Sequence, residues 1–188
     1  FVLDVVIGDP QWRWHPVRLI GEMIAFFEQR MNQGRYRRWK GVLFLSVVVA
    51  ITVVVVLGLT VMASAIHSWL GFAVASLLIY FSLSVKCLAD EASKIARELK
   101  EGNIEKARHS LSMIVGRDTD KLDEAEIIRA TVETVAESTM DGIVSPLFYA
   151  ALLGPLGAWI YKTVNTLDSM VGYKNERYRD FGWASAKC

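Results

Sequence analysis

Residues 41–66 constrain the fold of this chain most, because they include no charged residue and consist mainly of Val, Leu, Ile and Phe. The valine content alone is compatible with a buried strand, but strands rarely exceed about ten residues, so the length predicts a helix. Each of these apolar residues favours bilayer insertion by about 0.3 to 0.6 kcal/mol, which sums to roughly 5 to 10 kcal/mol over the stretch. We therefore expect residues 41–66 to form a transmembrane helix.

A second apolar stretch, residues 69–85, ends at Lys86 and is also expected to span the membrane. The link His67-Ser68 is too short to do more than turn, so the two helices should form an antiparallel hairpin. Basic residues flank the hairpin at both of its free ends, in residues 30–40 and again after Lys86. The positive-inside rule predicts that this side is cytoplasmic.

A third apolar stretch, residues 143–161, differs from the first two because it contains prolines and glycines. The Gly154-Pro155 pair divides it into pieces of about a dozen and half a dozen residues, which are lengths typical of re-entrant or interfacial segments. Basic residues flank both of its ends, so the charge rule does not require a crossing. We expect a broken, re-entrant element with both ends cytoplasmic, and the alternative is a tilted true span.

The remaining segments are expected to lie outside the bilayer. The two prolines and two tryptophans of residues 8–21 predict an irregular loop, and residues 19–31 suit a short amphipathic helix. Residues 88–113 read as an amphipathic helix broken near Gly102, and 121–140 as another. Short polar side chains favour helix N-termini, and the expected caps of that last helix are Asp118, Thr119 and Asp120.

The predicted fold class is therefore all-α, as a polytopic integral membrane protein with one membrane-embedded domain. Its parts, within residues 1–188, are transmembrane helices at 41–66 and 69–85, cytoplasmic helices over 88–142, a broken membrane segment at 143–161 and a polar motif segment at 162–188.

Composition excludes several other classes of protein. The formal net charge is only +1, so nothing draws the chain as a whole to nucleic acid, while 53% of the residues are hydrophobic. Two cysteines without paired spacing and three scattered histidines support neither a disulfide framework nor a zinc site. The chain begins at Phe1 rather than Met, and we expect it to be a piece of a longer protein.

Polar side chains gather along one face of the helix predicted at 121–140. At about 100° per residue, Glu126, Arg129, Glu133 and Glu137 fall within about 80° of one another. One interpretation is a solvated face stabilised by ion pairs three and four residues apart. The other is a functional face, because the stripe leads into Asp141 and the broken membrane segment.

The broken segment is followed by a second polar group, in YKTVNTLDSMVGYKNERY at 161–178. If the segment is re-entrant, both polar groups meet at the membrane surface, where several carboxylates would repel one another without a cation. Oxygen ligands with few histidines suit Mg²⁺. Arg117 and either Lys162 or Lys174 are then candidates to bind phosphate, and VGRDT lies ahead of a predicted helix N-terminus, which favours an anion.

Familiar catalytic motifs are missing from the sequence. It contains no Walker A motif, no Rossmann glycine pattern and no nucleophile elbow, and no histidine lies near Ser145 or Ser169. His15, in WHPVR, is better interpreted as stabilising a proline-rich loop than as a catalytic base.

Four stretches in order make a specific pattern: GDPQWRWHPVRLIG at 8–21, IVGRDTDKLDEAEIIRATVETVAESTMDGIVSPLFY at 114–149, the polar run at 161–178 and FGWASAK at 181–187. With these stretches the chain resembles the adenosylcobinamide-phosphate synthase family of cobalamin biosynthesis, known as CbiB or CobD. The resemblance covers nearly the whole chain, and the transmembrane hairpin is its least distinctive part.

The resemblance implies a multi-pass enzyme of the bacterial or archaeal cytoplasmic (inner) membrane, with its motif regions on the cytoplasmic side. Such enzymes are ATP-dependent ligases that join adenosylcobyric acid to aminopropanol phosphate or ethanolamine phosphate through an amide bond. ATP and Mg²⁺ are the implied cofactors. The implied partners are the corrinoid, the amino-alcohol phosphate and the lipid bilayer, with other late cobalamin-pathway membrane enzymes as further candidates and no nucleic acid.

The motifs that carry the resemblance supply the candidate site residues. Candidates for catalysis are Glu133, Glu137, Asp141 and Asp168, and the same four with Asp118 are the candidates for binding Mg²⁺. Candidates for binding substrate or phosphate are His15, Arg18, Arg117, Lys162, Asn165, Lys174 and Asn175.

The sequence departs from the family at two places. The family usually has Asn where this chain has Ser138, and its members continue beyond the SAK region into motifs that this sequence lacks.

Two rival functions stay open. A non-catalytic membrane sensor on the same scaffold should lose the acidic and lysine clusters, which are intact here. A transporter should show inverted repeats and polar groups within its spans, and neither is visible.

Overall fold

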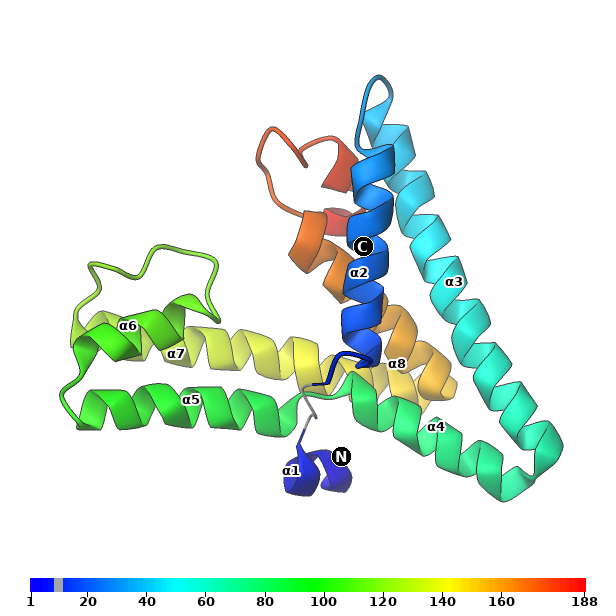
Figure 1. The fold of residues 1–188 in the computed structure, drawn as a ribbon, viewed down its shortest axis with the longest axis horizontal. Coiled ribbons are helices and arrows are strands. Elements are labelled where there is room, and N and C mark those ends of the chain that lie inside the picture. Colours follow the sequence, from blue (N-terminus) through cyan, green and yellow to red (C-terminus); the bar gives the residue numbers. More distant parts are fainter. Residues whose placement is uncertain (9–11) are drawn as a thin grey trace. The chain divides into compact units, whose positions relative to one another are not determined.

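The computed structural model describes residues 1–8 and 12–188, and every regular element in these ranges is helical (Figure 1). Three helical stretches are long and apolar enough to cross a membrane: Arg37–Ile66, Ser68–Lys100 and Glu124–Val171. The all-α, polytopic membrane fold class predicted from the sequence is thereby confirmed. The internal contacts of the chain group it into two compact units.

Unit 2 comprises Pro10–Leu83 and Ser145–Cys188. Its helices are α2 (Pro16–Met31), α3 (Arg37–Ile66), α4 (Ser68–Ser82) and α8 (Ser145–Val171), followed by the short 3₁₀ turns η2 (Phe181–Trp183) and η3 (Ser185–Lys187). Its buried core is formed by Ile20, Ile24, Phe44, Val48, Val56, Trp159, Leu167, Val171 and Phe181.

The hairpin expected from the first two apolar stretches is confirmed as α3 and α4. The Nδ1 atom of His67 accepts a hydrogen bond from the backbone N–H of Trp69 at 3.2 Å and so caps α4 within the turn. Gly71 lies so close to Ser64 of α3 that a Cβ atom on it would overlap the serine side chain. Small residues at this crossing allow the two backbones to approach closely, as in other membrane helix pairs.

Helix α8 is broken where the sequence predicts, at Gly154, whose φ of 63° and ψ of −151° are not helical. The two halves fold back on each other. Gly157 lies directly against the backbone carbonyl of Tyr149, and the rings of Tyr149 and Tyr161 stack with centroids 5.2 Å apart. Twelve residues of straight helix would separate those two tyrosines by about 18 Å.

The second half of α8 is longer than expected. The sequence predicts about half a dozen residues after the break, but the helix continues to Val171 and includes the NTLDSM run. The reason is its buried face, where Thr163, Leu167 and Val171 recur every four residues inside unit 2.

The FGWASAK stretch closes the core of unit 2 beside α3 and α8. Gly41, in the first turns of α3, lies against the backbone carbonyl of Phe181, and Gly182 lies against that of Val171. The Phe44 and Phe181 rings pack 4.9 Å apart. This motif therefore has a structural function, and it depends on two glycines that leave no room for a side chain.

Unit 1 comprises Phe1–Asp9 and Ser84–Val144. Its helices are α1 (Val2–Ile7), α5 (Val85–Lys100), α6 (Ile104–Ser112) and α7 (Glu124–Thr139), with a π-helical turn, η1 (Met140–Val144), after α7. Its core consists of Ile95, Ala107, Leu111, Ile127 and Ala130. The break between α5 and α6 falls at Gly102, as predicted.

Two sequence predictions at helix starts are wrong. Part of the loop predicted at 8–21 is helix, because α2 begins at Pro16, where a proline at the first helical position needs no N–H partner; residues 9–11 lie outside the described residues. Helix α7 begins at Glu124 rather than near Lys121. Its cap is Asp123, which forms a capping box with Glu126.

Candidate functional site

The candidate residues divide between the two units. Unit 1 holds Arg117, Asp118, Glu133, Glu137 and Asp141, and unit 2 holds His15, Arg18, Lys162, Asn165, Asp168, Lys174 and Asn175. One site shared by both groups stays a prediction.

In unit 1, the GRDT motif is a loop that is tied to the helices on both sides of it. The Thr119 side chain is only 2% exposed, and its hydroxyl donates to the backbone oxygen of Arg108 in α6 at 3.0 Å. Asp118 accepts from the N–H of Asp120 at 3.0 Å, which closes a local turn. The Arg117 guanidinium donates to Glu133 of α7 at 3.2 Å.

Glu133 is held by two arginines. Its Oε2 atom accepts from Arg117, and its Oε1 atom accepts from Arg129, one turn earlier on α7, at 2.9 Å. The structure thus confirms an ion pair four residues apart, as the solvated-face interpretation of this stripe predicts. The structure also gives Arg117 a carboxylate partner, Glu133. At the N-terminus of α7, where the sequence predicts a bound anion, the carboxylates of the Asp123–Glu126 capping box are present.

Asp141 lies in the π-helical turn η1, which the sequence analysis did not predict. A single π turn inserts an extra residue into a helix and often marks a functional site. The turn also leaves the Gly142 carbonyl able to accept from the N–H of Ser84 at 3.1 Å, which ties η1 to the start of α5 inside unit 1. Glu137 lies on the exposed surface of α7, just ahead of this turn.

In unit 2, three candidates form one stripe along the second half of α8. Lys162, Asn165 and Asp168 recur every three residues and so share a face of the helix. The Asp168 carboxylate lies over Gly172, whose missing side chain provides the room for it. The structure therefore presents this polar run from a helix, whereas the sequence analysis assigned residues 162–188 only as a polar motif segment.

The other unit 2 candidates lie at the ends of helices. Lys174 and Asn175 are exposed in the segment after α8, and the Oδ1 atom of the Asn175 side chain accepts from the N–H of Tyr178 at 3.0 Å, which caps a turn. His15 is 5% exposed at the start of α2, where its ring packs edge-on against Phe81 at 5.5 Å. This packing supports the structural interpretation of His15, while Arg18 is exposed on the first turn of α2.

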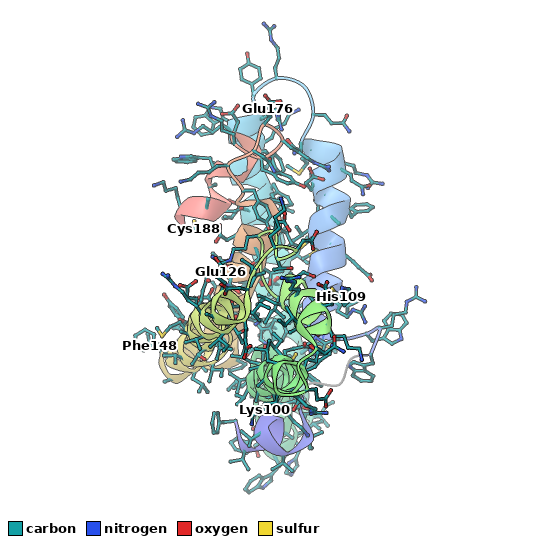
Figure 2. All side chains as sticks on the ribbon, turned by 90° about the vertical axis from the view of Figure 1, so that its left-hand side faces the viewer. Lys100, His109, Glu126, Phe148, Glu176 and Cys188 are labelled. Carbon is teal, nitrogen blue, oxygen red and sulfur yellow. The ribbon has the colours of Figure 1, made fainter. Side chains whose placement is uncertain are left out.

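Sequence reasoning missed one polar cluster, centred on Glu28 of α2, which is 5% exposed. Arg177 donates to both carboxylate oxygens at 3.1 and 2.9 Å, and Asn32 donates to one at 2.8 Å. Asn32 accepts from Arg37 of α3 at 2.9 Å, and Arg37 also donates to the backbone oxygens of Glu176 and Arg177. Figure 2 shows Glu176 beside the start of α3.

The predicted magnesium ligands are divided between the two units. In the ranges 1–8 and 12–188, no three His, Cys, Asp or Glu side chains come together as ligands for one ion. Glu133 has two arginine partners, and Asp168 belongs to a different unit from the other four acids. A magnesium site that draws ligands from both units stays a prediction.

Comparison with known proteins identifies the family. The family model described as CobD/Cbib protein matches residues 1–188. This chain belongs to the CobD/CbiB family of cobalamin biosynthesis proteins. No solved structure matches the fold of this family member.

Curated CobD/CbiB relatives are similar along the whole of this chain. It is 52% identical to a cobalamin biosynthesis protein CobD of Halalkalibacterium halodurans, where the match covers 100% of this chain and 59% of the relative. It is 49% identical to a CobD of Clostridium perfringens and 46% identical to a CbiB of Salmonella typhi, with 100% of this chain and 60% of the relative covered in each case. The chain thus spans about 60% of the length of these relatives.

The Glu28 cluster predicts an acid-dependent loss of stability. Burial alone would raise the pKa of the Glu28 carboxyl, but hydrogen bonds from Arg177 and Asn32 and the charges of Arg177 and Arg37 outweigh it, so the pKa is lowered from the ordinary value of 4.5. The ionised Glu28 carboxylate contributes its full stabilisation at pH values above the pKa that it has in the unfolded chain. This stabilisation is lost as the pH falls through the lower pKa of the folded state.

We therefore expect Glu28→Gln to destabilise the full-length protein by about 1 kcal/mol at neutral pH. The difference from wild type should shrink as the pH falls below about 4.5. Unfolding midpoints of both proteins between pH 3 and 7 measure it. A difference that stays constant over this range would contradict an ionised, paired Glu28.

Proposed function

We propose that the whole protein is an ATP-dependent amide ligase that joins adenosylcobyric acid to aminopropanol phosphate or ethanolamine phosphate. The product is adenosylcobinamide phosphate or its ethanolamine counterpart. The observation that carries this proposal is the family match along the entire chain. The motifs GRDT, DGI and NTLDSM are also intact.

The chemistry requires an activated carboxylate. The γ-phosphoryl group of ATP passes to a carboxylate oxygen of the corrinoid, which releases ADP and leaves an acyl phosphate. A base first takes one proton from the substrate ammonium, and the free amine nitrogen then attacks the acyl carbon. Phosphate leaves with its oxygen and takes up the second proton from the nitrogen. In this proposal, Mg²⁺ accompanies ATP.

The residues of unit 2 suit the second substrate. Lys174 is a point charge for the phosphate of the amino alcohol, and Lys162 lies on the same stripe of α8 as Asp168. Asp168 is a carboxylate on a rigid helix, which suits the base that accepts the ammonium proton. In unit 1, Thr119 anchors the GRDT loop, and Arg117 is the candidate for the ATP phosphates, which would replace Glu133 as its partner.

The proposal also sets the location of the protein. The three candidate spans indicate a membrane protein, and we place it in the bacterial or archaeal cytoplasmic membrane with its motifs on the cytoplasmic side. There the corrinoid, the amino-alcohol phosphate and ATP are all accessible, and other late-pathway membrane enzymes are candidate partners.

The test is a direct assay of the full-length protein in lipid nanodiscs with ATP, Mg²⁺, adenosylcobyric acid and each amine in turn. Amide formation is followed by liquid chromatography and mass spectrometry. Asp168→Asn should lower kcat by about 10² to 10³, the usual effect of losing a positioned base. The matched control is Ser169→Ala, next to it on α8, which loses only a hydrogen bond to the Asn165 backbone.

The control should keep kcat within about twofold of wild type. Wild-type protein that forms no amide with either amine would overturn the proposed function. Asp168→Asn with wild-type kcat would remove Asp168 from the mechanism while leaving the reaction in place.

A further inference from the structure

The segment after α8 contains turns but no helix or strand from Gly172 until η2, so its position depends on contacts with the rest of unit 2. Contacts near its ends and in its middle hold it within unit 2. Near its ends, Gly182 packs on the backbone of Val171. In its middle, Arg177 reaches the buried carboxylate of Glu28 on α2.

The contact at Glu28 joins three chain segments at one point. The Glu28 carboxylate binds the Arg177 side chain, while Asn32 and Arg37 bind the Arg177 backbone oxygen. Both the side chain and the main chain of one loop residue are therefore fixed. Bidentate arginine–carboxylate pairs add directional specificity beyond that of a single charge.

The presence of a buried ion pair is weak evidence that the pair stabilises the fold. An apolar pair of similar volume is often as stable, because the charges must be desolvated. Glu28 is almost fully buried, whereas the Arg177 side chain is 62% exposed, so the carboxylate bears most of the desolvation. Such a carboxylate is best explained by the geometry that it imposes on the loop.

Lys174 lies three residues before Arg177 and three after the last residue of α8. Three residues of extended chain span at most about 10 Å, so two fixed points this close restrict Lys174 to a small volume. Without the Glu28 contact, the middle of the loop would keep only the hydrogen bonds that Asn32 and Arg37 donate to its backbone oxygens. The Arg177 side chain would then be released, and the Lys174 ammonium would move over a larger volume.

We propose that Glu28 is a positioning residue: through Arg177, it fixes the loop that presents Lys174 to the phosphate of the amino-alcohol substrate. This inference rests on the proposed function, and it adds Glu28, Asn32, Arg37 and Arg177 as residues that prepare the substrate site without touching substrate.

The test compares Glu28→Gln with Glu22→Gln, an exposed glutamate on the same helix, both in the full-length protein in nanodiscs. The first readout is amide hydrogen exchange in residues 172–180. Glu28→Gln should accelerate exchange there by about tenfold, because the charge-assisted contact is lost, while exchange in α7 and in the control variant stays at the wild-type rate.

The second readout separates positioning from general damage. Glu28→Gln should raise KM for the amino-alcohol phosphate by about tenfold, with kcat and the KM values for ATP and corrinoid within about twofold of wild type. A merely structural defect would instead change all of these constants together. Arg177→Lys keeps the positive charge but loses the two-point contact with Glu28, so it should change the same kinetic constants in the same way. It replaces Glu28→Gln in the test if that variant does not fold.

Each result decides a different part of the proposal. Unchanged exchange in 172–180 would overturn the anchoring by Glu28, whatever the protein catalyses. Faster exchange with an unchanged KM for the amino-alcohol phosphate would overturn the assignment of the loop to that substrate. If wild-type protein forms no amide, the proposed function fails and the substrate assignment fails with it, while the exchange measurement still decides the anchoring.

Discussion

Alanine at Gly182 or at Gly41 is expected to lower the free energy of unfolding by about 3 kcal/mol, the upper end of the usual effect of overpacking. A Cβ atom at Gly182 would overlap the backbone carbonyl of Val171, and one at Gly41 would overlap that of Phe181. Both obstacles are backbone atoms of packed elements, so neither can move aside as a flexible side chain would. Denaturant unfolding of the full-length protein in detergent, followed by tryptophan fluorescence, measures the change.

The matched control for Gly41 is Gly58, which lies on the same helix. A Cβ atom at Gly58 has no neighbour within 4 Å, so alanine there should leave stability unchanged or raise it by up to about 1 kcal/mol through helix propensity. If Gly41→Ala changes the free energy of unfolding no more than Gly58→Ala does, FGWASAK does not pack closely against α3.

The fold could be predicted where the signal is local. Residues 41–66 are recognised as a membrane helix by length and hydropathy alone, and the Gly154-Pro155 break follows from the backbone chemistry of those two residues. The continuation of α8 to Val171 was missed because the apolar run stops at Tyr161. The four-residue spacing of Thr163, Leu167 and Val171 was visible, but it is a weaker signal than a change from apolar to polar composition.

The site could be predicted only in part, because only its local contacts leave a signal in the sequence. The Arg129–Glu133 pair is four residues apart on one helix, so the wheel predicts it. The Glu28–Arg177 contact joins residues 149 positions apart, and no periodicity links them. Arg117 was recognised as a motif residue, but its pairing with Glu133 depends on how the GRDT loop packs on α6 and α7.

The path of α8 in the membrane determines from which side of the bilayer positions 141 and 168 are accessible. Single cysteines replace Asp141 and Asp168 in full-length protein that lacks Cys87 and Cys188. A membrane-impermeant thiol reagent is then applied to native membranes from each side. We expect both positions to label only from the cytoplasmic side, because the two halves of α8 fold back on each other at Gly154 and a folded-back segment returns to the face that it left.

A cysteine at His67 is the control for this experiment. It lies in the turn of the α3–α4 hairpin, one full span away from the basic start of α3, so it should label only from the opposite side. Leaky membranes would label His67→Cys from both sides, whereas an inverted protein would exchange the labelling side of all three positions together.

Labelling of positions 141 and 168 from opposite sides would contradict the re-entrant path. The packing of Gly157 on Tyr149 would then have to open in the membrane, so that α8 could cross as a tilted span. GRDT with the acidic helix, and NTLDSM with Lys174, would lie on different faces of the bilayer. The proposed amide ligation could not use both motifs at one site, since ATP and the amino-alcohol phosphate must meet the same corrinoid carboxylate. The labelling result therefore tests the shared site before any kinetic measurement is made.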